Sequence, residues 1–444
     1  MGVAGAPDHG VHTRGGTWMR RLRLVLLAVG IAGASLALTS CGGGGGGTTG
    51  TLTIGDLVPL TGDLSDFGPP GEKAANIAAD QINKAAKSTG ADISGVKLIT
   101  DDSQTDPAAS VSAARKMSDE GATCIAGEWA SADTIPVARS VAIPDGILEI
   151  SPASTSDEIT GLDDNGLINR TAPPDSFQGP TLANAIEKDI GGANGKTVNI
   201  GARNDSYGTG LADSFSTAWE AKGGKIGQKV IYDPKAASYD SEAQKIVSGN
   251  PDATVIIDFP ETFVKVGPAL ARTGSWDPTK AFGTDGLASS SLPKDVGASI
   301  VEGFRGTAPG VPSSAPASKQ FNTLYTSSAP KNVARQTFDA QNFDAVVLCY
   351  LAAVAAGSTD GQDMADHLIA VTAPPGTQYT WKQLPEAIKA LQNGDDINYV
   401  GASGPVDMNS AGDTTAGVYE EYEYKNGKLT LPIADIPIAK PSGG

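Results

Sequence analysis

The stretch that decides the fold runs from residue 51 to residue 87 and reads TLTIGDLVPLTGDLSDFGPPGEKAANIAADQINKAAK. Residues 51–60 are largely apolar and β-branched and end at a proline, which predicts a strand. Residues 72–87 place apolar side chains at helical spacing, which predicts a helix: Ala75, Ile77, Ala78, Ile82 and Ala85. The stretch therefore predicts one strand followed by one helix, the repeating unit of an α/β protein.

The same alternation continues over most of the chain. Predicted strands lie at 96–100, 124–127, 147–150, 198–202, 227–232, 254–259 and around Phe282, with helices at 107–120, 132–140, 177–189, 208–222, 241–247 and 262–272. This spacing predicts parallel sheets with right-handed crossovers. Pro173-Pro174 separates two runs of such units, so we expect an α/β fold with two doubly wound parallel-sheet domains.

The C-terminal third has a different pattern. Residues 338–356 predict a long apolar helix and residues 381–392 a second one. Residues 418–425 and 428–431 predict a hairpin around Asn426-Gly427.

The amino-acid composition argues against several classes of function. The chain has 444 residues, with 33 Lys and Arg against 50 Asp and Glu, a net charge of −17. An acidic surface argues against nucleic acid as a partner. Three Cys and three His exclude a disulfide-dense scaffold and leave too few ligands for a paired-cysteine zinc site. We expect no metal and no cofactor.

The first 40 residues predict a signal peptide. Arg20, Arg21 and Arg23 precede an uncharged apolar run, residues 24–38, which is short for a membrane span. The run ends in Leu38-Thr39-Ser40-Cys41, which resembles a bacterial lipobox. That resemblance implies lipidation of Cys41, an anchor in the cell membrane and an extracytoplasmic location.

Residues 41–50 then form a glycine-rich tether. Other interpretations of the leader are an ordinary signal with an incidental Cys, a true start at Met19, and a twin-arginine signal at Arg20-Arg21.

Polar and aromatic residues follow the predicted strands, where ligands bind in open α/β sheets. Ser131 stands at a helix start, which favours a carboxylate, and Asp285 suits an ammonium group. Phe67, Trp129 and Tyr207 could enclose a small side chain. Each alone has a structural alternative: Ser131 as an N-cap, Tyr207 as a core residue. Their joint position at strand ends favours a binding site.

Short motifs follow one another in a fixed order and spacing from about Thr51 to Leu431. These are Ile54-Gly55-Asp56 through Gly62 with Phe67-Gly68, Asp101-Asp102 to Asp106-Pro107, Gly127 to Ser131, Ser151-Pro152-Ala153, Gln178-Gly179, Tyr207-Gly208, Phe343-Asp344-Ala345, Gly404-Pro405-Val406 and Gly412-Asp413. In these motifs the chain resembles the Leu/Ile/Val-binding protein family, the type I periplasmic binding proteins of branched-chain amino acid ABC transporters.

The resemblance implies a role for each matching residue. Ser131 and Thr155 would hold the α-carboxylate of an amino acid, and the Ala153 carbonyl, Thr155 and Asp285 its ammonium group. Tyr207 would close over the ligand, and Phe67, Trp129 and Phe343 would line the side-chain pocket. Two departures put leucine itself in doubt: Asp285 stands where leucine binders carry Glu, and Trp129 where they carry a smaller residue. Near Phe259-Pro260 the alignment slips, so no role is carried over there.

The resemblance further implies three crossings between the domains, near Pro173, Pro309 and Thr415. The first lobe would then comprise residues 51–172 and 309–415, and the second residues 173–308 and 416–440. The resemblance implies three partners: a branched-chain or other small aliphatic amino acid, the ABC permease subunits, and the membrane through the lipid anchor.

Three alternatives stay open from the sequence. Catalysis is disfavoured, because the predicted mature chain has a single His, His367, and no Gly-x-Ser-x-Gly, His-Glu-x-x-His or P-loop motif. The same fold could serve a sensor instead of a permease, or bind an amide, urea or aromatic acid. Cys124 and Cys349 could form a disulfide or remain two buried thiols.

Overall fold

The structure is a computed structural model that describes residues 50–312 and 315–438. The described residues belong to one compact unit, in which two sheets define two lobes. The predicted signal peptide, Cys41 and the tether up to Thr49 lie outside the described residues.

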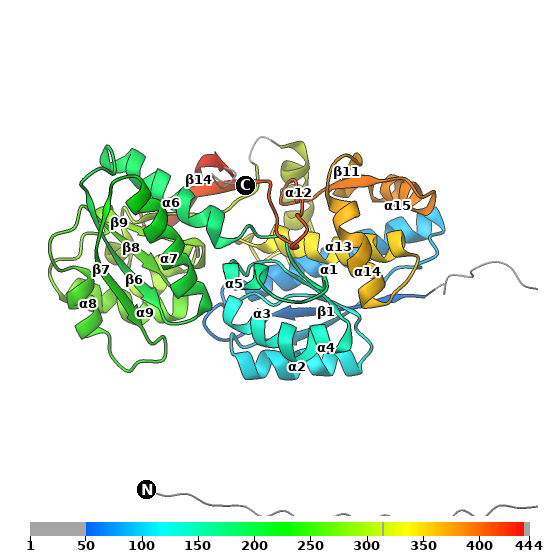
Figure 1. The fold of residues 1–444 in the computed structure, drawn as a ribbon, viewed down its shortest axis with the longest axis horizontal. Helices are drawn as coiled ribbons and strands as arrows, with labels where there is room; N and C mark the ends of the chain where they lie inside the picture. The colour runs from blue at the N-terminus through cyan, green and yellow to red at the C-terminus, as the bar shows by residue number, and fades with distance from the viewer. Residues whose placement is uncertain (1–49, 313–314, 439–444) are drawn as a thin grey trace, which may run out of the picture. The chain divides into compact units, whose positions relative to one another are not determined.

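The first lobe is built on a sheet of five parallel strands in the order β2-β1-β3-β4-β5. The strands are β1 (Leu52–Val58), β2 (Val96–Asp102), β3 (Cys124–Ala126), β4 (Leu148–Ser151) and β5 (Ile168–Arg170). The helices between them are α1 (Gly68–Thr89), α2 (Pro107–Asp119), α3 (Ser131–Val137), a π-helical turn (Ala138–Ala142), α4 (Ile143–Asp145) and α5 (Asp157–Thr160). Figure 1 shows β1 of this sheet with helices α1 to α5 around it.

C-terminal residues complete this lobe. They supply α12 (Pro316–Ser327), α13 (Asp339–Ala356), α14 (Gly361–Thr372), α15 (Leu384–Gln392) and a parallel strand pair, β11 (Thr377–Thr380) with β12 (Ile397–Val400). Helix α13 is buried along nearly its whole length and packs against α1 and α14. An all-round apolar helix of this kind belongs in a core.

The second lobe has seven strands in the order β14-β13-β10-β9-β8-β6-β7. The parallel strands are β6 (Thr197–Arg203), β7 (Lys225–Tyr232), β8 (Ala253–Ile257), β9 (Ala281–Gly283) and β10 (Arg305–Pro309). Its helices are α6 (Asp175–Ile190), α7 (Ser206–Ala221), α8 (Asp240–Ile246), α9 (Pro260–Arg272), α10 (Leu292–Val296) and α11 (Ala298–Val301), with 3₁₀ turns at Pro278–Lys280 and Asp285–Leu287. The chain passes between lobes after β5, after β10 and after β12.

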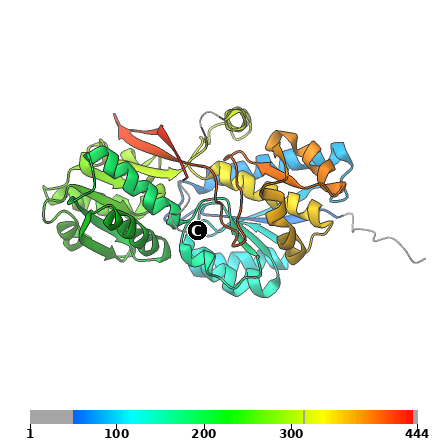
Figure 2. The same cartoon turned by 45° about the horizontal axis from the view of Figure 1, so that its top comes forward.

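An antiparallel hairpin forms the edge of the second sheet. Strands β13 (Val418–Lys425) and β14 (Lys428–Pro437) pair with each other, and β13 pairs with β10 (Figure 2). The turn residues Asn426 and Gly427 both have positive φ, 54° and 69°, as a two-residue hairpin turn requires. The predicted hairpin is confirmed, and so is the predicted class of two parallel α/β sheets, with antiparallel strands added at one edge.

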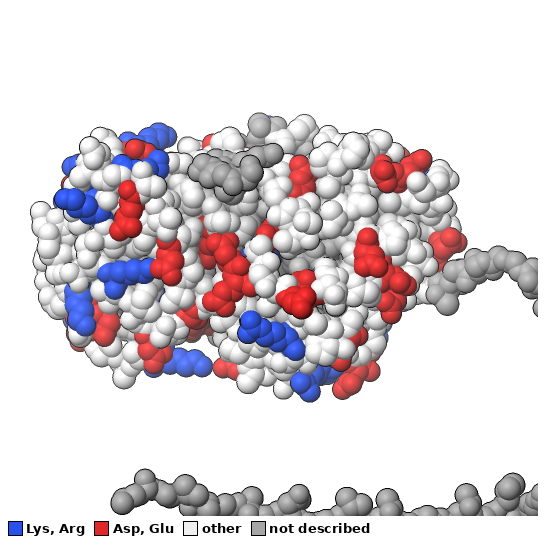
Figure 3. Space-filling model, in the orientation of Figure 1, with Lys and Arg blue, Asp and Glu red and all other residues white. Residues whose placement is uncertain are grey.

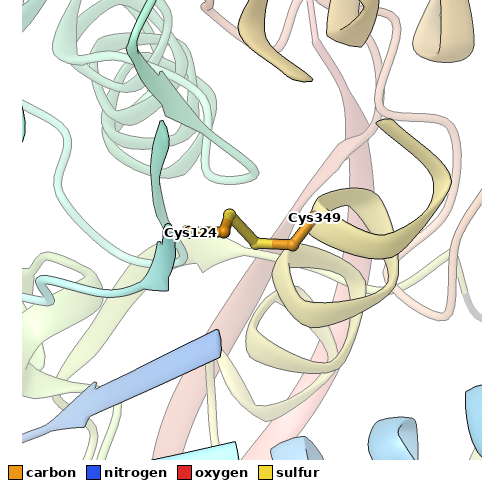
Figure 4. The surroundings of a disulfide bond; sticks show 2 residues. All are labelled: Cys124 and Cys349. Atoms are coloured by element: carbon orange, nitrogen blue, oxygen red, sulfur yellow. A yellow bond between two sulfur atoms is a disulfide. The ribbon is translucent and has the colours of Figure 1, made fainter. Parts of the chain in front are cut away.

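In the structure, Cys124 and Cys349 form a disulfide and are not two separate buried thiols. Cys124 of β3 and Cys349 of α13 are bonded, with their Cα atoms 6.0 Å apart (Figure 4). The bond joins residues 225 positions apart and fastens the C-terminal core helix to the N-terminal sheet.

Several predicted boundaries differ from those in the structure, among them the start of α1 and the end of the last strand, which runs to Pro437 rather than 431. Helix α1 begins at Gly68 rather than at residue 72, with two prolines in its first turn, where a missing N–H costs no hydrogen bond. Among the described residues, no single helix is long and apolar enough to cross a membrane. Helices α13 and α14 meet that test only as a pair, and they bend by 102° at their junction.

Candidate functional site

A small pocket lies where the two lobes meet. Five lining residues come from the first lobe, four from the second and one from the segment that leads into α13. They are Leu64, Phe67, Trp129, Ser131 and Ala153, then Tyr207, Phe259, Asp285 and Gly286, and finally Phe338. Most of them follow the carboxyl ends of strands, the expected place for a ligand in an open α/β sheet.

The first lobe contributes a wall of backbone groups and hydroxyls. Ser131 is the first residue of α3 and is buried, and its Oγ accepts hydrogen bonds from the backbone N–H groups of Thr155 and Ser156, each 3.2 Å long. Ala153 lines the pocket directly. Thr155 lies one hydrogen bond behind Ser131, with a fully buried side chain, and is not itself a lining residue.

The second lobe contributes a buried carboxylate. Asp285 follows β9, and its Oδ1 accepts a hydrogen bond from Tyr207 Oη at 2.9 Å and one from Gln178 Nε2 at 2.5 Å. Burial raises the pKa of Asp285 to about 6, and the bonds from Gln178 and Tyr207 oppose that rise. Asp285 is therefore mostly ionised at pH 7 and can accept further N–H donors.

Tyr207 is held in place from two sides. Its hydroxyl lies 2.7 Å from Thr284 Oγ1, and its ring stacks on Phe259 with centroids 5.0 Å apart. Burial raises the pKa of Tyr207 well above its usual value, so the phenol keeps its proton and donates to Asp285.

The apolar wall is aromatic. Phe338 meets Phe67 edge-on at 6.3 Å and Trp129 edge-on at 6.3 Å. Phe338 has a φ of 72°, in the left-handed region that bulky residues rarely adopt. Such strain persists only where the surroundings impose it, and it often marks a functional position.

Phe343 does not line this pocket, and the expectation that it would is wrong. Its side chain is fully buried in the core of the first lobe, 4.9 Å from the Phe321 ring and 5.6 Å from the Trp381 ring. Phe338, just before α13, takes the lining position, and Phe343, inside the helix, faces the core.

Sequence reasoning also missed Leu64, Phe259, Gly286 and Gln178. Leu64 sits in the same β1–α1 loop as Phe67, and Gln178 was noted only as part of a family motif. The remaining predicted residues, Phe67, Trp129, Ser131, Ala153, Tyr207 and Asp285, are brought together in one pocket.

Three buried acids lie behind the Trp129 wall. Burial raises the pKa of Glu128 to about 8, of Glu149 to about 8 and of Asp133 to about 9. Glu128 Oε2 accepts the Trp129 N–H at 2.9 Å, and the Glu128 N–H donates to Glu149 Oε1 at 3.5 Å. Within residues 50–312 and 315–438, no group of three His, Cys, Asp or Glu side chains is arranged to hold a metal ion.

The face drawn in Figure 3 carries scattered charges of both signs. Asp and Glu side chains are spread over the face in Figure 3, and the Lys and Arg side chains on that face form no continuous patch.

Two α/β lobes with a pocket of hydroxyls, aromatic rings and one carboxylate between them define a binding protein that encloses a small ligand. The family model described as "Periplasmic binding protein" matches residues 51–416, and the chain belongs to this family. Members of the family are substrate-binding proteins that act outside the cytoplasm. The resemblance to Leu/Ile/Val-binding proteins is thereby confirmed.

Two relatives give the range of similarity. A leucine-, isoleucine-, valine-, threonine- and alanine-binding protein of Pseudomonas aeruginosa is 31% identical over 208 residues, which are 47% of this chain and 51% of the relative. A chemotactic signal transduction system substrate-binding protein of Halobacterium salinarum is 25% identical over 82% of this chain and 85% of its own length. The first match thus spans about half of the relative.

Solved structures share the fold. An isoleucine complex of a branched-chain amino acid transporter substrate-binding protein from Streptococcus pneumoniae has a TM-score of 0.70 at 20% identity, covering 87% of this chain and 99% of that one. A benzoate complex of a solute-binding protein from R. palustris has a TM-score of 0.65 at 18% identity, covering 88% and 97%. At these identities the likeness concerns the fold alone.

Proposed function

We propose that this protein captures an L-α-amino acid, branched-chain or otherwise small and aliphatic, between its two lobes and delivers it to an ABC permease. The observation behind this proposal is the position of Asp285 in the same small pocket as Ser131 and Ala153. An ammonium group and a carboxylate on one carbon atom need a carboxylate on one side and hydrogen-bond donors on the other.

Each residue has a role in this proposal. The Ser131 hydroxyl holds the ligand carboxylate, and the Thr155 backbone N–H supports that hydroxyl from behind at 3.2 Å. The Ala153 carbonyl and Asp285 hold the ammonium group, whereas Thr155, expected from the resemblance to contact the ligand, does not line the pocket. Tyr207 closes over the ligand, and Phe67, Trp129 and Phe338 surround its side chain. Burying both charges of a zwitterion is favourable only when both are paired, so ligands that lack one charge are rejected.

The proposal includes an anchor and a partner. Cys41 carries a lipid on the extracytoplasmic face of the cell membrane, and residues 42–50 tether the lobes within reach of the permease. What supports the anchor is the lipobox-like sequence before Cys41, together with the glycine run after it.

A second candidate is an aromatic acid. The aromatic wall of Phe67, Trp129, Phe259 and Phe338 favours it, as does the benzoate complex of a protein with this fold. The buried Asp285 disfavours it, because a carboxylate ligand without an ammonium group would leave that charge unpaired.

Calorimetric titration distinguishes the two. The twenty L-amino acids, benzoate, urea and acetamide are titrated into the purified protein. The proposal predicts binding of at least one aliphatic amino acid and none of benzoate. Binding of benzoate alone would replace the amino-acid proposal with the second candidate, and binding of urea or acetamide alone would point to an amide receptor.

A sensor would bind the same ligand, and the name of the Halobacterium salinarum relative supports that use of the family. Uptake of the labelled ligand by cells with and without the gene separates the roles, because only a transport component lowers uptake when it is removed.

A further inference from the structure

The loop between β1 and α1, residues 59–67, faces both the pocket and the second lobe. Leu64 and Phe67 are buried and line the pocket. Asp63 and Asp66 are partly exposed and reach the opposite lobe: Asp63 Oδ2 accepts from Arg203 Nη2 at 3.0 Å, and Asp66 Oδ2 from the hydroxyls of Ser289 and Ser291.

The first lobe holds this loop firmly. Asp102 accepts hydrogen bonds from the Thr61 N–H at 3.1 Å and the Thr61 hydroxyl at 2.6 Å, and Thr105 Oγ1 accepts from the Leu64 N–H at 3.1 Å. Gly62 turns the chain with a φ of 84°, and a Cβ there would come within 1.9 Å of the Gln104 carbonyl oxygen. The loop therefore moves with the first lobe.

Arg203, the partner of Asp63, ends β6 in the second lobe and is 4% exposed. Its Nε donates to Asp205 in the same lobe, and its Nη1 lies 3.8 Å from Asp258 Oδ1. Asp205 holds the Arg203 guanidinium from within the second lobe. Asp63 is therefore not needed to fix the position of the guanidinium, and its contribution is the contact between the two lobes. Thr262 Oγ1 of α9 adds a second cross-lobe hydrogen bond to Asp63 Oδ2, at 3.2 Å.

Arg203 is also part of the support of the pocket wall. Its guanidinium lies 3.7 Å from the centre of the Phe259 ring, a close cation–π contact. Phe259 stacks on Tyr207, and Tyr207 donates to Asp285. A continuous set of contacts thus runs from Asp63 in one lobe through Arg203, Phe259 and Tyr207 to the carboxylate of Asp285.

We propose that the Asp63–Arg203 ion pair is a closure latch, and that Arg203 is a positioning residue that sets the Phe259–Tyr207 wall when the lobes close. The pair can form only when the first-lobe loop meets the second lobe, and its arginine lies over the Phe259 ring that lines the pocket. This proposal rests on the proposed function for its ligand but not for the latch itself.

The test uses the full chain and three variants. Asp63→Asn removes the ionic contact across the lobes and leaves Arg203 held by Asp205. Arg203→Lys keeps the charge but loses the flat face over Phe259. The matched control is Lys235→Gln, which removes another cross-lobe ion pair, between Lys235 and Asp106 at 3.4 Å. These two side chains are 80% and 40% exposed, and neither lines the pocket.

The first measurement is binding, with L-leucine, L-isoleucine, L-valine, L-threonine and L-alanine as probes in 0.05 M and 1 M NaCl. For the tightest of these, Asp63→Asn and Arg203→Lys each weaken binding about tenfold through faster dissociation. Raising the NaCl concentration from 0.05 M to 1 M weakens binding to the unchanged protein several-fold but leaves binding to Asp63→Asn the same. Lys235→Gln has the affinity and the salt dependence of the unchanged protein. Affinity of Asp63→Asn within twofold of the unchanged protein overturns the latch.

The second measurement needs no ligand. Hydrogen–deuterium exchange of residues 59–67 and 203–209 in the ligand-free protein rises in Asp63→Asn and stays unchanged in Lys235→Gln. If none of the five amino acids binds, the proposed function fails and this exchange alone decides on the latch: faster exchange in Asp63→Asn supports it, and unchanged exchange overturns it.

Discussion

Gln178 donates a hydrogen bond from its side-chain nitrogen to Asp285 Oδ1 over 2.5 Å, from the first helix after the chain enters the second lobe. Both side chains are buried. The amide therefore fixes the direction of the carboxylate from behind, which leaves the rest of Asp285 for a ligand.

Gln178→Ala tests this support. Without the amide, Asp285 Oδ1 keeps only the Tyr207 bond, and the charged form of the carboxylate becomes less stable. Hydrogen bonds to charged groups contribute about 1.5–3 kcal/mol, so we expect amino-acid affinity to fall by about tenfold or more in calorimetric titration. Asp213→Asn, at a side chain that is 75% exposed, is the control and should bind as the unchanged protein does. Unaltered affinity in Gln178→Ala would show that Asp285 needs no such support.

The affinity should depend on pH in one direction. Because the pKa of Asp285 is raised to about 6, the carboxylate is ionised above that pH and gains a proton below it. An ammonium group pairs only with the ionised form, so affinity is kept above pH 6 and falls by up to about tenfold per pH unit below it. Titrations at pH 7.5, 6 and 5 measure this. Asp285→Asn should bind more weakly at every pH and show a flat profile, and a pH dependence that survives in Asp285→Asn would assign it to another group.

The disulfide between Cys124 and Cys349 should stabilise the first lobe. It closes a loop of 225 positions, for which chain entropy predicts about 5 kcal/mol. We expect a reducing agent to lower the melting temperature of the unchanged protein by several degrees. The double variant Cys124→Ala/Cys349→Ala should melt at a lower temperature than the unchanged protein, and the reducing agent should not change that temperature. Equal melting curves with and without reductant, with both thiols free to a thiol reagent, would contradict the bond.

The buried acids behind Trp129 predict how folding stability changes with pH. Glu128 and Glu149 have folded-state pKa values of about 8, raised by burial from 4.5. Between about pH 5 and 8 the folded protein holds protons that the unfolded chain has released, so the free energy of unfolding falls as the pH rises. Urea denaturation at pH 5.5 and 7.5 measures the slope. The glutamine side chain in Glu149→Gln cannot ionise. This variant should therefore show a shallower slope of the free energy of unfolding against pH, by up to about 1.4 kcal/mol per pH unit. A slope of the opposite sign would show that these acids are ionised in the folded state.

The sequence predicted those parts of the site that depend on local position. Ser131, Ala153, Tyr207 and Asp285 each follow a strand, and strand ends of parallel sheets converge, so their meeting in one pocket could be foreseen. The hairpin could be foreseen as well, because Asn426-Gly427 fits its turn.

Contacts made across long stretches of chain could not be predicted. The position of Phe338 depends on how the segment before α13 passes the β1–α1 loop, which local spacing does not show. The resemblance implied a lining role for Phe343, but that residue lies inside α13 and faces the core. The Cys124–Cys349 bond required knowing that α13 packs against β3. The Asp63–Arg203 pair forms only where the two lobes meet. The spacing of apolar residues predicts helices and strands but not such contacts between lobes.

The role of Asp285 is tested by comparing one amino acid with its own 2-oxo acid, which keeps the carboxylate and the side chain but lacks the ammonium group. Both are titrated into the unchanged protein at pH 7.5, with the tightest-binding aliphatic L-amino acid as the reference. If Asp285 pairs with the ammonium group, the amino acid binds at least about a hundredfold more tightly than the 2-oxo acid, because the latter leaves a buried carboxylate unpaired. Equal affinity for the two, or binding of the 2-oxo acid alone, would contradict an amino-acid site built on Asp285.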